Sequence, residues 1–141
     1  MNLTAKSEYA CLAMLELAQH YDARLPLQVR RIAQRHGIPS PFLVQILQEF
    51  KRAGLVSSTR GANGGYRLAQ PPSDISLADV LNVFEGSSEP TGCAASESPL
   101  APVLLDVCCE LSRVRRELLA ETTLADLLER ATAETAQMWY I

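Results

Sequence analysis

Residues 37–69, GIPSPFLVQILQEFKRAGLVSSTRGANGGYRLA, contain the pattern that decides the fold. Ser40 followed by Pro41 is a pair that helix starts prefer, with a hydroxyl at the N-cap and proline at the first helical position. Apolar residues then recur at helical spacing, and polar or charged residues occupy the positions between them. The segment therefore predicts an amphipathic helix whose apolar stripe is made by Leu43, Ile46, Leu47 and Phe50.

A shorter helix is predicted directly before this one. Val29, Ile32 and Ala33 share one face, and Gly37 follows as a stop signal. Two helices joined by a short turn have the layout of a helix-turn-helix, although a plain helical hairpin has the same pattern. In a helix-turn-helix, the first turns of the second helix meet base edges in the major groove. The residues expected to face DNA on these two helices are Arg30, Ser40, Pro41, Phe42, Gln45, Gln48 and Lys51.

A glycine-rich loop follows, flanked by β-forming residues at 55–59 and 66–69, and this arrangement predicts a hairpin. The loop lacks both the G-x-x-x-x-G-K-[ST] and the G-x-G-x-x-G nucleotide-binding patterns, and no helix directly follows it. A hairpin directly after a helix-turn-helix is a wing, whose slim tip can enter the minor groove or lie along phosphates. The wing residues expected at DNA are Arg60, Gly61, Asn63, Gly64, Gly65 and Arg67.

The distribution of charge favours the same side of the chain as a DNA-binding surface. Residues 1–70 hold nine Lys and Arg against four Asp and Glu, a net of +5, so the remainder of a chain of net charge −3 carries −8. Such asymmetry indicates that the first half meets an anion, although a chance clustering of solvated charges would look the same.

The segments on either side complete a mainly α-helical chain. Thr4 is expected to cap a helix that runs to about His20, and Ser76 with Asp79 forms a capping-box pattern before another helix. A small, polar, proline-containing loop covers 87–99. From about residue 100, apolar residues recur about every 3.5 positions, as in a helix packed along another helix, and Thr123 with Asp126 starts a final helix. The expected dimer contacts are Leu104, Cys108, Leu111, Val114 and Leu118.

Composition narrows the class of protein further. A chain of 141 residues is about one domain, and no apolar run approaches the roughly 18 residues of a membrane span. The N-terminal stretch does not resemble a signal peptide, so we expect a cytoplasmic protein whose four cysteines are reduced. No local signature of a thiol nucleophile and no paired carboxylates in a pocket-like context are present, so we expect no enzyme.

Three stretches resemble the Rrf-type winged-helix transcription regulators of bacteria. They are residues 6–18, KSEYACLAMLELA, residues 30–69, and residues 122–128, TTLADLL. The R-G-x-x-G-G-Y pattern of the wing is the most specific, and the resemblance weakens over 87–121. It implies a winged helix-turn-helix domain over 1–86 and a dimerisation helix with a C-terminal helix over 100–141. It also implies a homodimer that regulates genes by binding double-stranded DNA, for which symmetry predicts an inverted-repeat operator.

The resemblance leaves the regulatory signal open. Many members of the family bind an iron–sulfur cluster through three closely spaced cysteines before the long helix, but only Cys93 occupies that loop here. Another branch uses a glutamate of the first helix and a histidine of the helix-turn-helix, and Glu8 and His36 occupy the matching positions. By that resemblance, a 2Fe–2S cluster bridging two subunits would use Cys93, Glu8, His36 and one of Cys108 and Cys109.

Each of these residues also has a structural interpretation. A cysteine in a helix stripe is commonly a small buried hydrophobe. A histidine before a helix-ending glycine commonly contacts the last carbonyls, and Glu8 fits an ordinary surface carboxylate. Cys108 and Cys109 are adjacent, so on a helix they point about 100° apart and cannot easily face one metal. The alternative to a cluster is a regulator controlled by thiol state, a metabolite or a protein partner.

Overall fold

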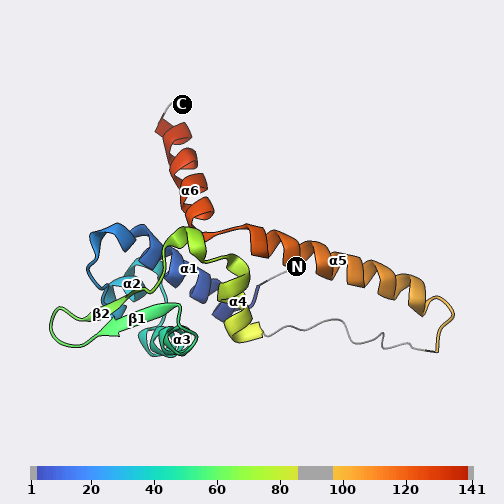
Figure 1. Ribbon diagram of the computed structural model, residues 1–141, viewed down its shortest axis with the longest axis horizontal. Coiled ribbons are helices and arrows are strands. Elements are labelled where there is room, and N and C mark those ends of the chain that lie inside the picture. The colour runs from blue at the N-terminus through green and yellow to red at the C-terminus, as the bar shows by residue number, and fades with distance from the viewer. Residues whose placement is uncertain (1–2, 86–96, 140–141) are drawn as a thin grey trace.

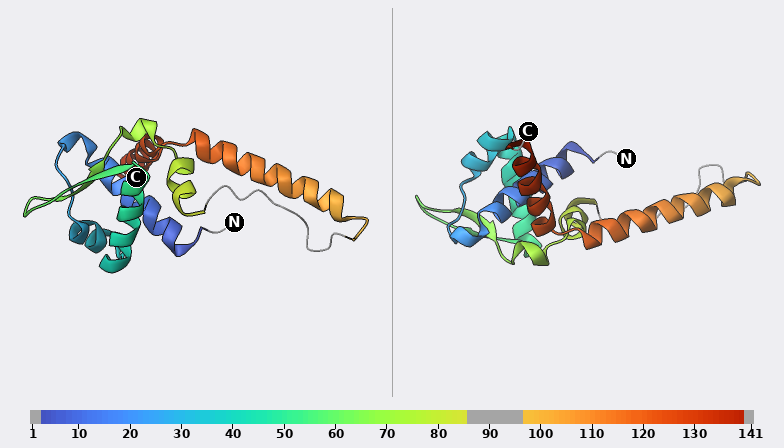
Figure 2. Two further views of the ribbon diagram at one scale, coloured as in Figure 1. Left: turned by 60° about the horizontal axis from the view of Figure 1, so that its bottom comes forward. Right: turned by 90° about the horizontal axis from the view of Figure 1, so that it is seen from above.

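The computed structural model describes residues 3–85 and 97–139, and the described chain is mainly α-helical with one small antiparallel hairpin. Figure 1 shows α1 to α4 and the hairpin gathered into one body; α6 starts beside α1, and the long helix α5 projects from the body in a different direction. In both views of Figure 2 the long helix α5 again extends away from that body. The elements, in chain order, are α1 (Ala5–Gln19), the 3-10 turn η1 (Tyr21–Ala23), α2 (Val29–His36), α3 (Ser40–Arg52), β1 (Val56–Thr59), β2 (Gly65–Leu68), the 3-10 turn η2 (Pro72–Asp74), α4 (Leu77–Glu85), α5 (Ala101–Glu121) and α6 (Leu124–Trp139).

Side-chain caps fix the starts of several helices. The Thr4 hydroxyl accepts a hydrogen bond from the Ser7 amide (3.2 Å), which confirms the predicted cap of α1. Ser76 and Asp79 exchange reciprocal hydrogen bonds of 3.0 and 3.1 Å. Thr123 and Asp126 do the same at 3.0 and 3.1 Å. Each capping box satisfies two backbone amides that the first turn leaves without an internal partner.

The predicted cap of α3 is wrong by one residue. Pro39 occupies the N-cap position, α3 begins at Ser40, and the Ser40 side chain makes no capping bond. Pro41 therefore lies at the second helical position. This arrangement costs no backbone bond, because the first amides of a helix have no partner within it.

The core forms where α1, α2 and α3 meet the hairpin and α4. All four residues of the predicted α3 stripe have 0% exposure, and Met14, Ile32 and Val80 are equally buried. Burying one such side chain contributes about 1.5–3 kcal/mol to folding. The chain after α5 returns to this core: Leu124 is also fully buried, and backbone bonds join Leu77 to Thr122 (2.8 Å) and Leu124 to Ile75 (3.0 Å). The predicted boundaries between domains stay a prediction.

The hairpin is locked to the segment before α2. Its register pairs Val56 with Leu68 and Thr59 with Gly65. Leu27 exchanges two backbone hydrogen bonds of 2.8 Å with Tyr66, so it adds a third extended segment beside β2. Gly65 permits this approach, because a Cβ there would lie 2.1 Å from the Leu27 carbonyl oxygen. In the part of the chain described, no helix combines the length and the apolarity needed to cross a membrane.

Candidate nucleic-acid interface

The helix-turn-helix is formed by α2 and α3. The turn begins at Gly37, whose φ of 64° lies in the left-handed region that glycine adopts most readily. Ile38 then donates to the Ala33 carbonyl (3.0 Å) and buries its side chain. This turn leaves one face of α3 in solvent. The exposed residues on it that the sequence predicted are Ser40, Pro41, Gln45, Gln48 and Lys51, and Arg30 is exposed on α2.

Phe42 differs from the other predicted contacts on α3. Its ring lies edge-to-face against Tyr9 of α1, with centroids 5.7 Å apart, and it is half-buried. The ring therefore anchors the start of α3 to α1, and only part of it remains available to a ligand. Sequence spacing placed Phe42 with the exposed residues because its partner lies in a distant segment.

The wing carries one arginine that is available and one that is engaged. Arg60 is exposed, and no hydrogen bond or ion pair within the described residues holds its side chain. Arg67 donates instead to the Arg24 carbonyl (3.3 Å) and is half-exposed. Arg24 itself has a left-handed backbone, with φ of 56°. Arg67 therefore helps to hold the loop before α2 against β2.

The tip of the wing is tied down by a residue that the sequence did not single out. The Gln28 side-chain amide donates to the Ala62 carbonyl (3.2 Å), which links the start of α2 to the loop. Gly61 and Asn63 are exposed, whereas Gly64 is buried and Gly65 half-buried. A Cβ on Gly64 would lie 2.2 Å from the Thr59 carbonyl oxygen. Gly64 and Gly65 are thus required by packing within the wing, whatever the wing contacts.

A buried carboxylate joins α1 to α2 behind the interface. Only 2% of the Glu16 side chain is exposed, and its oxygens lie 2.9 Å from His36 Nε2, 3.1 Å from Arg35 and 3.2 Å from His20 Nε2. Burial by itself raises the pKa of Glu16, but the hydrogen bond with His36 and the charges of Arg35, His36 and His20 outweigh it and lower the pKa. His36, a predicted metal ligand, is thereby engaged in the packing of two helices.

The remaining predicted metal ligands that the structure describes do not converge within one chain. Glu8 and Cys109 are exposed, Cys108 is half-buried, and Cys93 lies outside the described residues. Among the described residues, no group of three or more His, Cys, Asp or Glu is arranged to hold a metal ion. Burial, followed by the nearby Glu85 carboxylate, raises the pKa of the Cys11 thiol to about 11, so this thiol stays protonated at neutral pH.

The projecting helix α5, together with Leu100 at its N-cap, carries a row of apolar side chains in solvent. The row repeats at alternating spacings of four and three residues, the pattern of a helix that packs along another helix. Cys108 lies one position beyond the row, about 100° around the helix. The exposed fractions in the row are 74% for Leu100, 57% for Leu104, 51% for Val107, 66% for Leu111, 50% for Val114 and 60% for Leu118.

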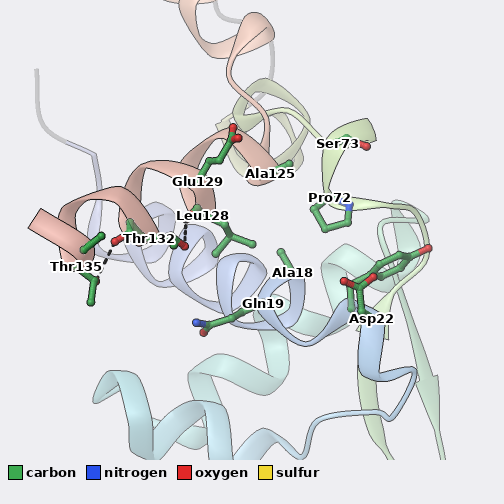
Figure 3. Close-up of a pocket in the computed structure, with 13 residues that line it drawn as sticks. Ala18, Gln19, Asp22, Pro72, Ser73, Ala125, Leu128, Glu129, Thr132 and Thr135 are labelled. Atoms are coloured by element: carbon green, nitrogen blue, oxygen red, sulfur yellow. Dashed lines mark hydrogen bonds between the residues drawn. The ribbon is translucent and has the colours of Figure 1, made fainter.

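A groove of about 870 Å³ lies away from the wing, between the end of α1, the two 3-10 turns and α6 (Figure 3). Ala18, Ala125 and Leu128 line its apolar part. The hydroxyls of Thr132 and Thr135 donate to carbonyls of α6 at 3.0 Å, so they are already satisfied. The groove offers a shallow and largely apolar surface, and none of the residues expected at DNA lines it.

Comparisons with known proteins agree with this geometry. The family model Rrf2, described as an iron-dependent transcriptional regulator, matches residues 3–130. Protein rrf2 of Nitratidesulfovibrio vulgaris is 34% identical over 138 residues, which cover 94% of this chain and 90% of that protein. The structure of T. potens IscR superposes with a TM-score of 0.78 at 36% identity, covering 93% of this chain and 88% of the other. The structure of CymR, the global cysteine regulator of B. subtilis, gives a TM-score of 0.81 at 31% identity, covering 92% and 98%.

Proposed function

This chain belongs to the Rrf2 family of transcriptional regulators, and we propose that it is a homodimer that binds an inverted-repeat DNA operator through α3 and the wing. The family and its relatives are DNA-binding regulators of transcription and not enzymes. The observation that carries the proposal is the exposed polar face of α3 beside a wing whose loop is held at Gln28 and carries the exposed Arg60. We propose that the protein acts in the cytoplasm.

Within this interface, different residues have different tasks. Ser40 and Gln45 lie in the first turns of α3, where a recognition helix meets base edges, so they are proposed to select sequence. Arg60 is proposed to bind a phosphate or to enter the minor groove, together with Gly61 and Asn63. Lys51 and Gln48, farther along α3, and Arg30 on α2 are proposed to contact the sugar–phosphate backbone. Arg67 contributes charge to this surface while it remains bonded to the Arg24 carbonyl.

The test of this interface is the salt dependence of DNA binding. Arg60→Ala should weaken binding to every sequence and lower the slope of log affinity against log salt by about one, as for one lost phosphate contact. Arg130→Ala is the matched control, because it removes the same charge from an exposed position on α6. Equal salt slopes for Arg60→Ala and the unmodified protein would show that the wing does not contact DNA.

The apolar row on α5 supports the homodimer. Six apolar side chains at coiled-coil spacing, each at least half exposed, would be costly to leave in water. Packing two copies of α5 about a twofold axis covers this row and places two α3 helices symmetrically. Two such helices require half-sites whose centres are one helical turn, or a multiple of it, apart.

An iron–sulfur cluster is the signal proposed first. It is supported by the family's description as iron-dependent and by the positions of Glu8, His36 and Cys93, which resemble those of ligands used in the family. Since the described ligands do not converge in one chain, we propose that such a cluster bridges two subunits and includes Cys93. His36 can join the ligands only by leaving its 2.9 Å contact with Glu16. Thiolate ligands suit iron, and the bound cluster would supply a redox-sensitive centre.

A regulator without a cluster is the second proposal. It is favoured by the missing three-cysteine motif and by similarity to a global cysteine regulator along nearly its whole length. Its input would be thiol state, a metabolite or a protein partner.

Anaerobic reconstitution with iron and sulfide separates the two proposals. The cluster is supported if the reconstituted protein absorbs visible light and retains iron, and if both signals fall in Cys93→Ala and Glu8→Ala but not in Cys11→Ala. Colourless, iron-free protein after reconstitution contradicts the cluster and leaves the regulator without one.

A further inference from the structure

Glu85, the last residue of α4, joins three helices through one carboxylate. Its Oε1 accepts a hydrogen bond from the Ser7 hydroxyl of α1 at 3.0 Å. Its Oε2 accepts one from the Arg115 guanidinium of α5 at 3.1 Å. Each oxygen therefore holds a different helix, and the half-buried position of the pair protects it from full solvent screening.

The bond to α1 is built into the fold. Ser7 is 1% exposed, and its hydroxyl oxygen accepts from the Thr4 hydroxyl at 3.0 Å. Its single proton is then free to donate to Glu85. Without that carboxylate the buried hydroxyl would lose its acceptor, which is unfavourable in a buried site.

The neighbours of Glu85 and Ser7 reach the recognition helix. Phe84 packs edge-to-face against Phe50 of α3, with centroids 5.2 Å apart. Lys6 lies 4.7 Å above the Phe84 ring and forms an ion pair of 3.3 Å with Glu49 of α3. The same short segments therefore contact α5 on one side and α3 on the other.

Glu85 also attaches α5 to the body at a point away from the end of that helix. The end of α5 is fixed by the backbone bond from Leu77 to Thr122, and α4 is the described element against which α5 packs most extensively. Arg115 and Thr122 are seven residues apart, or about 10 Å along a helix. A helix held at one end can swing, whereas a helix held at two points has a defined direction.

We propose that Glu85, through Arg115, sets the angle between the dimer helix α5 and the DNA-binding body, and thereby the distance between the two recognition helices. Glu85 is a positioning residue, and this inference rests on the proposed homodimer. The leverage is large, because α5 has 21 residues and is about 32 Å long. A tilt of about 6° moves its far end by about 3.4 Å, which equals the rise of one base pair.

The experiment measures preference for half-site spacing. The probe is a duplex that the unmodified protein selects from a random library, together with versions that have one base pair added or removed between the half-sites. A duplex with a single half-site reports contacts to DNA alone. The variants are Arg115→Ala and Glu85→Gln, the second of which keeps an acceptor for Ser7. Arg113→Ala is the matched control, because its ion pairs, at 3.0 and 4.0 Å, stay within α5.

The expected result is a loss of spacing preference without loss of binding. We expect the unmodified protein and Arg113→Ala to prefer the selected spacing at least about fivefold. Arg115→Ala and Glu85→Gln should reduce this preference, while dimer mass and single half-site affinity stay unchanged, and Arg115→Lys should restore part of it. If both variants fold and keep the spacing preference of the unmodified protein, the proposed role of Glu85 is wrong, while the proposed function stands. If the unmodified protein enriches no inverted repeat from the library, the proposed function is wrong, and so is this inference.

Discussion

Shortening one exposed leucine of α5 should weaken the dimer by a predictable amount. Leu111 is in the middle of the apolar row and is 66% exposed in the single chain. Fully burying a leucine side chain is worth about 1.5–3 kcal/mol, so covering two-thirds of it gains about 1–2 kcal/mol. Twofold symmetry repeats the contact in the partner, so Leu111→Ala should cost about 2–4 kcal/mol of dimer stability. At about 1.4 kcal/mol per factor of ten, the dimer should dissociate about 30- to 700-fold more readily.

Sedimentation equilibrium over a dilution series measures this constant directly. Leu25→Ala is the matched control, because Leu25 is 71% exposed but lies in the loop before α2. Leu111→Glu extends the series, since it would bury an unpaired charge and should yield monomers at micromolar concentration. A dissociation constant for Leu111→Ala equal to that of the unmodified protein would refute the assignment of α5 as the subunit contact.

Three further predictions follow from the described contacts. Gln45→Ala should relax base preference at one position of each half-site, measured by affinity for single-base variants of a selected duplex; uniform weakening at all positions would contradict a base contact. Gly65→Ala should lower the free energy of unfolding by at least about 2 kcal/mol, because the new Cβ would clash with the Leu27 carbonyl and because residue 65 has a φ of 154°. Gly54→Ala should cost less, because a Cβ at residue 54 would meet no atom within 4 Å. Hydrogen bonds from Thr123 lower the pKa of Asp126, so its stabilisation is present at neutral pH and is lost as the pH falls below about 4 through the lowered pKa. The difference in urea midpoint between the unmodified protein and Asp126→Ala should therefore shrink in acid, and a constant difference would exclude this origin.

Local patterns in the sequence were sufficient for the framework of the fold. The apolar stripe of α3 is completely buried, and the boxes at Ser76 and Thr123 form as their spacing predicts. These features depend on residues within a turn or two of each other, where the helical repeat determines which side chains meet. The wing follows for the same reason, because the glycines and the flanking β-formers are adjacent in the chain.

Contacts between distant segments were beyond this kind of prediction. Phe42 packs on Tyr9, Arg67 bonds to the Arg24 carbonyl, and His36 pairs with Glu16, and each partner lies in another element. The apolar row of α5 also contains one position that the sequence left open. A spacing of about 3.5 residues allows either Val107 or Cys108 in the row. In the structure Val107 is 51% exposed, whereas Cys108 is half-buried within its own chain.

Selection of DNA from a random duplex library, followed by the mass of the resulting complex in solution, tests the central claim most directly. The proposed homodimer predicts enrichment of an inverted repeat with half-site centres one helical turn, or a multiple of it, apart. It also predicts two copies of the chain on each operator. Enrichment of a single undivided site occupied by one copy, or of no sequence at all, would contradict the account.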